Sequence, residues 1–394
     1  MLLTTLVVAA CHCLTAVAQV PPTLEVTTYD KSSVVPGFIY LAPNTVPFAG
    51  PYVFDLNGTT VFKGAGKLSG TVHDFQPCVY QKKQRFCAWQ GTTAFGYGSG
   101  QAVILDDQFK VIKALPASDY HEFKIVQAID AQGQYSDTAY LTVYTPVRRD
   151  LSAFGVPNEN DQGWVIDCHF RAVDPVSNKV IFDWSSLDHV PLSESYVRPT
   201  GGINGYSQRS AWDYFHLDSV ARLSGGDYLI SSRHTSTIYR ISGKDGSITW
   251  RLGGKSSDFQ LQDFSFDSQH DVRVVSSTGD TLTLSLFDNE YNTFVQPPKG
   301  LSSGKIIEVN TATKTARLLH QYDSPSKDIG NPSGDGGSVQ VIAKGNVFIG
   351  WGSDAQVTEH TADGRLVYAA RFGVPGSSAN SYRAFKGPFT GIQK

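Results

Sequence analysis

The 394-residue sequence has few charged residues and almost no excess of either sign. Charged residues make up 18% of it, and 33 Lys and Arg stand against 36 Asp and Glu, for a formal net charge of −3. This balance argues against a protein that binds nucleic acid through a strongly basic face. Hydrophobic residues make up 41% and aromatic residues 12%. A chain of this composition is not disordered, and it is long enough to bury a large core.

Several catalytic motifs are also missing. The sequence has no GxSxG, no HExxH and no strand-GxGxxG-helix unit, and the run LGGKS at 252–256 lacks the first glycine of a phosphate-binding loop. These absences argue against lipase, zincin, dinucleotide-binding and NTPase functions. The five cysteines show no CxxC spacing, which argues against a cysteine-based metal site. We expect neither a metal nor a cofactor.

The N-terminal segment is predicted to be a signal peptide covering residues 1–18. An apolar run from Leu2 to Val17 is followed by Ala16-Val17-Ala18, with small residues where signal peptidase cleaves. The alternative is a short membrane anchor, but about 16 apolar residues fall short of the ~20 that a span needs. We therefore expect a mature chain that begins at Gln19, is secreted or lies in the secretory-pathway lumen, and is not attached to a membrane.

The cysteines and one sequon agree with an oxidising compartment. Cys11 and Cys13 leave with the signal peptide, while Cys78 and Cys87 lie nine residues apart across an expected hairpin and are predicted to form a disulfide. Cys168 lies in the strand-like run WVIDCHF and is expected to be a buried free thiol. Asn57, in the turn sequence Asn57-Gly58-Thr59, is a predicted glycosylation acceptor.

A loose repeat of four short strands runs along the chain. In its clearest copy the expected strands are Asp218–Leu223, Tyr228–Ser232, Ile238–Ile241 and Ile248–Leu252, joined by turns rich in glycine and polar residues. Weaker copies begin at His73, His121, His270 and Ser338, and a partial copy precedes His73. Six such units predict an all-β fold, a single six-bladed β-propeller over residues 19–394. The terminal segments near Leu24–Val26 and Ser381–Phe385 are expected to close the ring by sharing a blade.

The strand-initial histidines are the candidate site. His73, His121, His216 and His270 are predicted to occupy equivalent repeat positions, so their side chains would meet at one mouth of the central channel. Arg233, after the second strand of the clearest copy, is expected to enter the same pocket. Histidines and an arginine suit an oxyanion and support nucleophilic or acid–base chemistry. The long irregular stretch 187–209 is a candidate lid.

The following motifs together resemble the arylsulfotransferase (ASST) family, in particular its secreted fungal branch: WDYFHLDSVARLSGGDYLISSRHTSTIYRISGKDGSITWRLGG, FSFDSQHDVR, LSLFDNE, DYHEFKIV, FDWSSLDHV and SYRAFKGPFTG. The resemblance covers nearly the whole mature chain and implies a six-bladed propeller. It also implies, from the bacterial enzymes, a channel histidine that accepts a sulfuryl group from an aryl sulfate and passes it to a phenol. The residue that matches this nucleophile is His270. His121, His216 and Arg233 match the groups that bind the sulfuryl oxygens.

Two departures from the family pattern favour a different reaction. The HxNS motif of the family reads His216-Leu217-Asp218-Ser219 here, so a carboxylate stands where an amide donates to a sulfate oxygen. At ~4 Å and an effective dielectric constant of about 20, the repulsion between two such charges is about 4 kcal/mol. The extra N-terminal β domain of the bacterial enzymes is not expected. Asp218 and His216 would instead form an acid–base pair.

Three hypotheses follow for the function. The first is a hetero-Diels–Alder cyclisation between a phenolic or tropolone quinone methide and a terpene alkene, the activity that some similar fungal proteins imply. His121, His216, His270, Arg233 and Asp218 would then be catalytic, and aromatic walls would hold the terpene: Trp212, Tyr214, Phe215 and Trp351. The second is an aryl sulfotransferase that works through a sulfohistidine at His270. The third is a non-catalytic propeller that binds a ligand.

Overall fold

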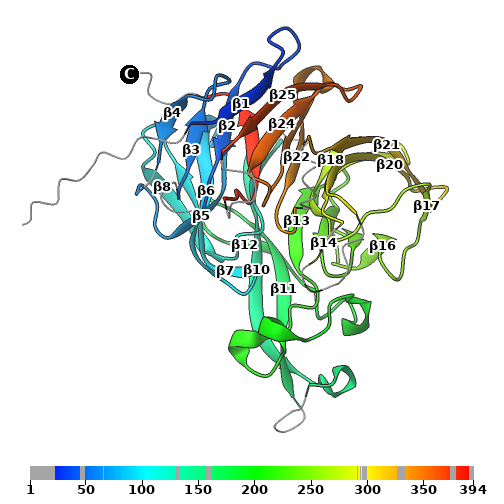
Figure 1. The fold of residues 1–394 in the computed structure, drawn as a ribbon. Coiled ribbons are helices and arrows are strands. Elements are labelled where there is room, and N and C mark those ends of the chain that lie inside the picture. Colours follow the sequence, from blue (N-terminus) through cyan, green and yellow to red (C-terminus); the bar gives the residue numbers. More distant parts are fainter. Residues whose placement is uncertain are drawn as a thin grey trace, which may run out of the picture.

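The computed structural model describes residues 23–44, 49–64, 66–129, 133–156, 162–290, 292, 294, 300–325, 333–372 and 379–389. The strands form six sheets of four or five strands each, arranged around a common axis (Figure 1). The predicted six-bladed β-propeller is therefore confirmed. The described residues contain strands and short 3-10 turns but no α-helix. No helix among them is long and apolar enough to cross a membrane.

Each blade is an antiparallel meander, and two blades carry a fifth strand at the outer edge. From the innermost strand outward, the blades consist of the following strands: blade 1, β26 (Ala384–Gly387), β2 (Phe38–Leu41), β3 (Tyr52–Phe54) and β4 (Thr60–Lys63); blade 2, β5 (Thr71–Tyr80), β6 (Lys83–Ala94), β7 (Tyr97–Leu105) and β8 (Val111–Ser118); blade 3, β9 (Phe123–Ile129), β10 (Tyr135–Arg149), β11 (Gly163–Val173) and β12 (Val180–Ser185); blade 4, β13 (Leu217–Arg222), β14 (Tyr228–Ser232), β15 (Thr237–Ile241) and β16 (Ile248–Gly253); blade 5, β18 (His270–Thr278), β19 (Thr281–Asp288), β20 (Ser303–Asn310), β21 (Thr315–Asp323) and β17 (Gln260–Gln262); blade 6, β22 (Ser338–Val341), β23 (Val347–Gly350), β24 (Gln356–His360), β25 (Leu366–Arg371) and β1 (Glu25–Tyr29).

Both ends of the chain close the ring, but in different blades. The C-terminal strand β26 pairs with β2 as the innermost strand of blade 1. The N-terminal strand β1 pairs with β25 at the outer edge of blade 6. The segments near 24–26 and 381–385 thus do close the propeller as expected. They do not share one blade, because the N-terminal segment joins blade 6 and the C-terminal segment joins blade 1.

The hydrophobic core is divided among the gaps between blades. Six clusters of buried apolar side chains each join residues of two neighbouring blades, so every blade is packed on both faces. This burial explains why the strands are rich in Val, Ile, Leu and aromatic residues on both faces instead of alternating with polar ones. The predicted strands of blade 4 agree with β13–β16 to within one residue. The glycine in the β15–β16 turn, Gly246, has a φ of +77°, as a left-handed turn position requires.

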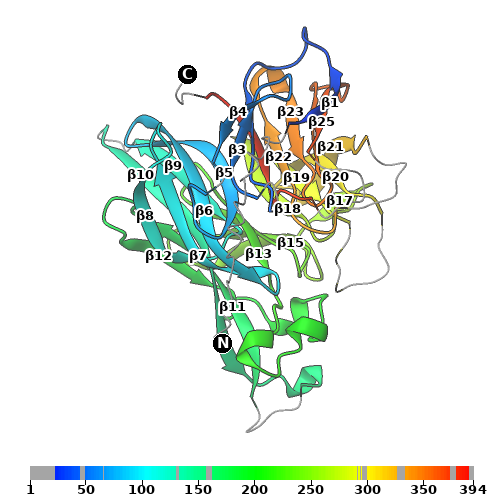
Figure 2. The same cartoon turned by 60° about the vertical axis from the view of Figure 1, so that its left-hand side comes forward.

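The longest hairpin extends beyond the ring. Strands β10 and β11 project from the propeller together with the irregular segment that follows β12 (Figures 1 and 2). This segment contains three 3-10 turns, η3 (Leu192–Glu194), η4 (Gly201–Ile203) and η5 (Gln208–Ser210). Arg209 lies over the ring of Phe95, 5.5 Å from its centroid. The stretch predicted as a lid therefore contacts the loop between β6 and β7.

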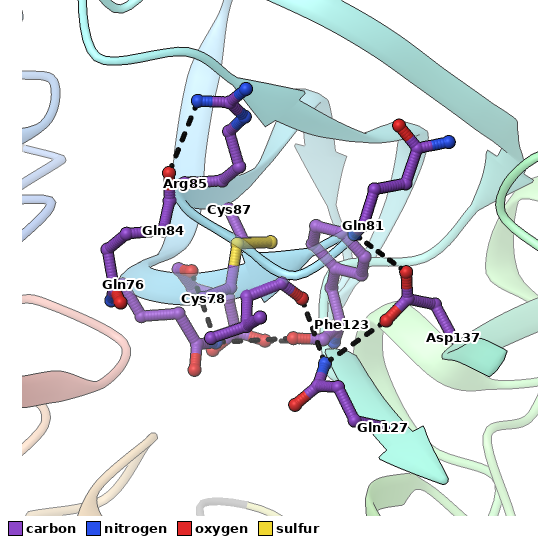
Figure 3. The surroundings of a disulfide bond; sticks show 11 residues. Gln76, Cys78, Gln81, Gln84, Arg85, Cys87, Phe123, Gln127 and Asp137 are labelled. Carbon is purple, nitrogen blue, oxygen red and sulfur yellow. Dashed lines mark hydrogen bonds between the residues drawn. A yellow bond between two sulfur atoms is a disulfide. The ribbon is translucent and has the colours of Figure 1, made fainter. Parts of the chain in front are cut away.

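The predicted disulfide joins Cys78 and Cys87 across the β5–β6 hairpin, with the two Cα atoms 5.8 Å apart (Figure 3). Cys168 is a buried free thiol, as expected. Asn57 is exposed in the turn between β3 and β4, where a glycosylation acceptor is accessible. The predicted signal peptide, with Cys11 and Cys13, lies outside the described residues.

Candidate functional site

A ladder of hydrogen bonds joins the innermost strands of the blades and defines which residues are equivalent. In five blades a side chain near the start of the innermost strand accepts the N–H of the next blade's strand, at 2.9–3.1 Å. The accepting residues are Asp74, Glu122, Ser219, Asp271 and Ser338. In the sixth, Arg383 closes the circle by donating to both carboxylate oxygens of Asp74 at 3.0 Å. The residue before each of these is therefore equivalent from blade to blade.

This equivalence corrects the predicted histidine positions. His73, His121 and His270 directly precede ladder residues and so occupy the equivalent positions that were predicted for them, but the residue that precedes Ser219 is Asp218. His216 lies two residues earlier in blade 4. Bulges interrupt the pairing at the start of these inner strands, and a bulge leaves no mark in the hydrophobic pattern of the sequence. The repeat pattern therefore aligned His216 with the other three histidines. Asp218 thus occupies a histidine position of the repeat.

The histidines of blades 3, 4 and 5 nevertheless meet in space. The rings of His121 and His216 are 4.5 Å apart between centroids, and Nε2 of His216 lies 3.6 Å from Oδ1 of Asp218. Nε2 of His270 lies 3.2 Å from the same oxygen. The exposed fractions of these four side chains are between 0% and 8%. We call these four residues the channel cluster.

Each imidazole of the channel cluster is held through its Nδ1 atom. His121 Nδ1 donates to Asp119 at 2.5 Å, and His216 Nδ1 donates to Asp213 at 2.5 Å. His270 Nδ1 donates to Oδ1 of Asn289 at 2.6 Å.

The amide of Asn289 is oriented by its own neighbours. Its Nδ2 donates to the carbonyls of Ser333 and Gly336, so its oxygen faces the imidazole of His270. The proton of His270 therefore lies on Nδ1, and Nε2 presents a lone pair to the channel cluster.

Burial sets the protonation of His270 and Asp218. The pKa of His270 lies well below its usual range because the ring is desolvated and Arg233 is near. Burial raises the pKa of Asp218 to about 7, although His216 and Arg233 oppose the shift. Neither oxygen of Asp218, nor Nε2 of His121 or His270, has a hydrogen-bond partner among the described residues.

Arg233 enters from the turn after β14, as predicted. Its Nη1 donates to the carbonyl of Ser268 at 3.0 Å and lies 3.4 Å from Nδ1 of His270. Its Nη2 donates to the carbonyl of Gly334 at 2.7 Å. The guanidinium thus holds two loops beside the channel cluster.

A buried ion-pair network under the channel cluster was missed by the sequence reasoning. Arg383, which has no exposed side-chain surface, also donates to the carbonyl of Asp218 at 2.7 Å. Arg273 pairs with Glu122 and Asp271 at 2.8 and 2.7 Å. A signal was present, because an acidic residue follows His73, His121 and His270 directly in the sequence.

A cavity of about 300 Å³ lies beside the channel cluster, and its wall combines aromatic side chains with polar ones such as Asn44, Thr93 and Ser353. His73, Tyr120 and Tyr382 line it together with Asp335. The ring of His73 stacks on Tyr120 at 4.3 Å, and Tyr120 in turn stacks on His121 at 4.1 Å. His73 is 5% exposed, and neither of its ring nitrogens has a partner in the described chain. Burial lowers its pKa to about 4, so the ring is neutral.

The four aromatic residues predicted to bind substrate lie elsewhere. Trp212, Tyr214 and Phe215 are fully buried in the core between blades 3 and 4, and Trp351 is buried between blades 5 and 6. None of them lines the cavity beside the channel cluster. Their role in binding stays a prediction, and the aromatic wall in the structure is formed by His73, Tyr120 and Tyr382 instead.

Two groups of described residues bring enough ligand atoms together to hold a metal ion. One is His121, His216 and Asp218, and the other is Asp213, His216 and His234. A larger hollow of about 740 Å³ lies at the outer edge of blades 2 and 3, and none of its lining residues belongs to the channel cluster.

Comparisons with known proteins identify a family but no close relative. Among solved structures, the chain is similar to the following three: hydrazine synthase of Kuenenia stuttgartiensis (12% identity, 90% of this chain and 81% of that one, TM-score 0.40), a protein from Lactobacillus plantarum (13%, 89% and 99%, TM-score 0.41), and a protein of unknown function from Bacteroides caccae (12%, 52% and 55%, TM-score 0.30). The chain thus spans about half the length of the Bacteroides protein. Similarities of this level carry no argument about function.

A search of curated proteins gives no significant match. The sequence model of the arylsulfotransferase (ASST) family, by contrast, matches residues 82–373, which include blades 3 to 5 and the whole channel cluster. The chain belongs to the arylsulfotransferase (ASST) family.

Proposed function

We propose that this ASST-fold protein is an enzyme that couples a phenolic or tropolone quinone methide to a terpene alkene by a hetero-Diels–Alder cyclisation. The observation that carries the proposal is the position of Asp218, whose Oδ1 lies 3.2 Å from Nε2 of His270. A sulfuryl group on that nitrogen would meet a carboxyl group, whereas its oxygens need hydrogen-bond donors. The geometry therefore favours a reaction in which no anionic group is transferred to His270.

The cavity beside the channel cluster also supports the proposed cyclisation. Its aromatic wall suits an aromatic substrate beside an apolar alkene, and about 300 Å³ is at the lower end of the range for small-molecule sites. Holding both partners in one site converts a bimolecular step into an effectively unimolecular one, which can lower the barrier by several kcal/mol. Arg209 and Phe95 at the rim link the long segment after β12 to this cavity.

In the proposed reaction His73, which lines the cavity, assists formation of the quinone methide. In a ring that carries a hydroxyl and a neighbouring hydroxymethyl group, the ring O–H gives its proton to a nitrogen of His73. The C–O bond of the hydroxymethyl group breaks, and the departing hydroxide takes that proton and leaves as water. The heterodiene then adds to the alkene, so that one C–C and one C–O bond form from the existing π electrons and no atom is lost.

Sulfuryl transfer is the second candidate, and one observation favours it. Asn289 fixes the proton of His270 on Nδ1, so Nε2 carries the lone pair that a sulfuryl acceptor needs. Asp218 and the two carbonyls that occupy Arg233 argue against it.

The test is to incubate the purified protein with a hydroxymethyl tropolone and a terpene that has a trisubstituted ring alkene. We expect a product whose mass is the sum of the two minus one water, formed as one stereoisomer faster than without protein. His73→Ala is expected to slow it at least tenfold, in line with general acid–base catalysis. His320→Ala on the outer strand β21 is the matched control. A racemic product at the background rate contradicts the proposal.

The second candidate is checked in parallel with nitrophenyl sulfate. Release of nitrophenol, together with a sulfuryl adduct on the peptide that contains His270, would establish sulfuryl transfer in place of the cyclisation.

A further inference from the structure

We propose that His121, His216 and Asp218 form a binding site for a divalent first-row transition-metal ion. Their ligand atoms, two imidazole nitrogens and a carboxylate oxygen, all lie within 4.8 Å of one another. Ligands that bind one ion at about 2.0–2.1 Å lie about 3.3–3.5 Å apart in tetrahedral geometry. The three atoms therefore need to close by no more than about 1.5 Å, which side-chain rotation can supply.

The histidines are oriented as metal ligands usually are. A histidine that binds a metal through one nitrogen almost always donates its other N–H to a carboxylate or carbonyl oxygen, which fixes the tautomer. Here Asp119 accepts from Nδ1 of His121, and Asp213 accepts from Nδ1 of His216. Asp119 and Asp213 also accept the backbone N–H of the same histidines, so they are held firmly. Both Nε2 atoms are thus left with a lone pair, and that of His216 lies 3.6 Å from Oδ1 of Asp218.

The channel cluster also contains buried polar atoms that lack a hydrogen-bond partner. Nε2 of His121 and both oxygens of Asp218 are fully buried and have no hydrogen-bond partner in the described chain. Leaving such groups unpaired in a buried site is unfavourable, so a partner is expected. Nε2 of His121 is an acceptor in the tautomer that Asp119 imposes, and both oxygens of Asp218 are acceptors when its carboxyl group is ionised. A group of acceptors around one point suits a cation and not a sulfate or phosphate.

The charges around the proposed site also favour a cation. The carboxylates of Asp119 and Asp213 hold its two histidines, and binding of a cation would keep the carboxyl group of Asp218 ionised, against the positive charge of Arg233. Arg383 lies below, but its charge is matched by Asp74 and Asp271. The alternative group of Asp213, His216 and His234 is less suitable, because Asp213 already accepts two hydrogen bonds from His216.

The ligand set limits the kind of ion. Two imidazoles and one carboxylate with open positions bind zinc, iron(II), cobalt(II) or manganese(II), whereas calcium and magnesium prefer oxygen ligands. Nε2 of His270 lies 3.2 Å from Oδ1 of Asp218, next to the proposed ligand set but not part of it. In a part of the inference that rests on the proposed cyclisation, the open positions would take the two vicinal oxygens of the tropolone, which form a chelate.

The site is tested by titrating chelator-treated full-length protein with Co²⁺ and recording its visible absorption, with Zn²⁺ as competitor. We expect one Co²⁺ per chain, absorption bands between about 500 and 650 nm that Zn²⁺ abolishes, and a rise in the melting temperature. Asp218→Asn and His121→Gln are expected to weaken Co²⁺ binding at least tenfold. His320→Gln is the matched control and should bind as the wild type does.

Two results would overturn the proposal. One is the absence of saturable Co²⁺ absorption from the wild-type protein. The other is binding that survives in both Asp218→Asn and His121→Gln while the variants keep the wild-type circular dichroism spectrum. Because binding is measured without substrate, a metal site without cyclisation activity would refute only the proposed function, and cyclisation after complete chelation would refute only the role of the metal in it.

Discussion

Oδ1 of Asp218 lies 3.2 Å from Nε2 of His270, and both side chains are fully buried. These two residues occupy the same position in blades 4 and 5, directly before the hydrogen-bond ladder that joins the inner strands. The contact is thus a consequence of the propeller repeat, which brings equivalent residues of neighbouring blades together at the channel. A carboxyl group at a position where four other blades carry histidine or tyrosine changes what the channel can bind.

Replacing this carboxyl group by an amide is expected to create sulfuryl-transfer activity. Asp218→Asn restores the amide of the family's HxNS motif and gives the cluster a donor in place of an acceptor. Hydrogen bonds to charged groups contribute about 1.5–3 kcal/mol, so nitrophenol release from nitrophenyl sulfate should rise about 10- to 100-fold above the wild-type rate. His270→Ala in the same background should abolish the gain. Equal rates in Asp218→Asn and wild type would show that another feature excludes the aryl sulfate.

The arginine that closes the ring is expected to be the most sensitive position in the fold. Arg383→Met leaves Asp74 buried without its partner and removes the bond to the carbonyl of Asp218. Breaking one side of a buried ion pair costs about 3–5 kcal/mol, which urea unfolding followed by fluorescence would measure. Arg317→Met, at an exposed pair with Glu308, should change the stability little. A loss below about 1 kcal/mol for Arg383→Met would mean that the network is not what holds the blades together.

The strands of blade 4 were predictable because Gly-Gly and Lys-Asp-Gly turns separate short apolar runs, and these signals depend only on local sequence. The true position of His216, two residues before its predicted equivalent, was not predictable, because it depends on bulges that each shift the strand register by one residue. His121, Asp218 and His270 come together only in the closed ring, which places equivalent residues of neighbouring blades side by side at the channel. The roles of Tyr382 and Arg383 had no local signal, because they depend on the pairing of β26 with blade 1 and on contacts with residues far away in the sequence.

The disulfide should contribute measurable stability. Cys78 and Cys87 are nine residues apart. In the chain-entropy account, a cross-link over this separation lowers the conformational entropy of the unfolded chain and so raises its free energy by about 2–3 kcal/mol. For a chain of this size we expect Cys78→Ser with Cys87→Ser to melt several degrees below the wild type in scanning calorimetry. Cys168→Ser tests whether the effect belongs to the bridge. A reductant should lower the melting temperature of Cys168→Ser but leave the double variant unchanged.

His169 provides a pH-dependent contribution to stability on the outer side of blade 3. Its Nδ1 lies 2.8 Å from Asp183, and its Nε2 lies 3.2 Å from Asp167. Burial lowers the pKa of His169, but the hydrogen bonds to these two carboxylates outweigh it and raise the pKa to about 9. Because the folded pKa is above the value of about 6.5 in the unfolded chain, the stabilisation is complete below pH 6.5 and disappears as the pH rises through 9.

The comparison of wild type with His169→Gln measures the contribution of the charged His169 side chain to the free energy of unfolding. Urea unfolding between pH 5.5 and 10 keeps both aspartates ionised, so only the histidine titrates. We expect wild type to be more stable by on the order of 1 kcal/mol at pH 6, a small value because Asp183 is 38% exposed and solvent screens the pair. The difference should vanish near pH 10, where the imidazole is neutral in both states. A difference that is constant across this range would show that His169 stabilises the blade by packing and not by its charge.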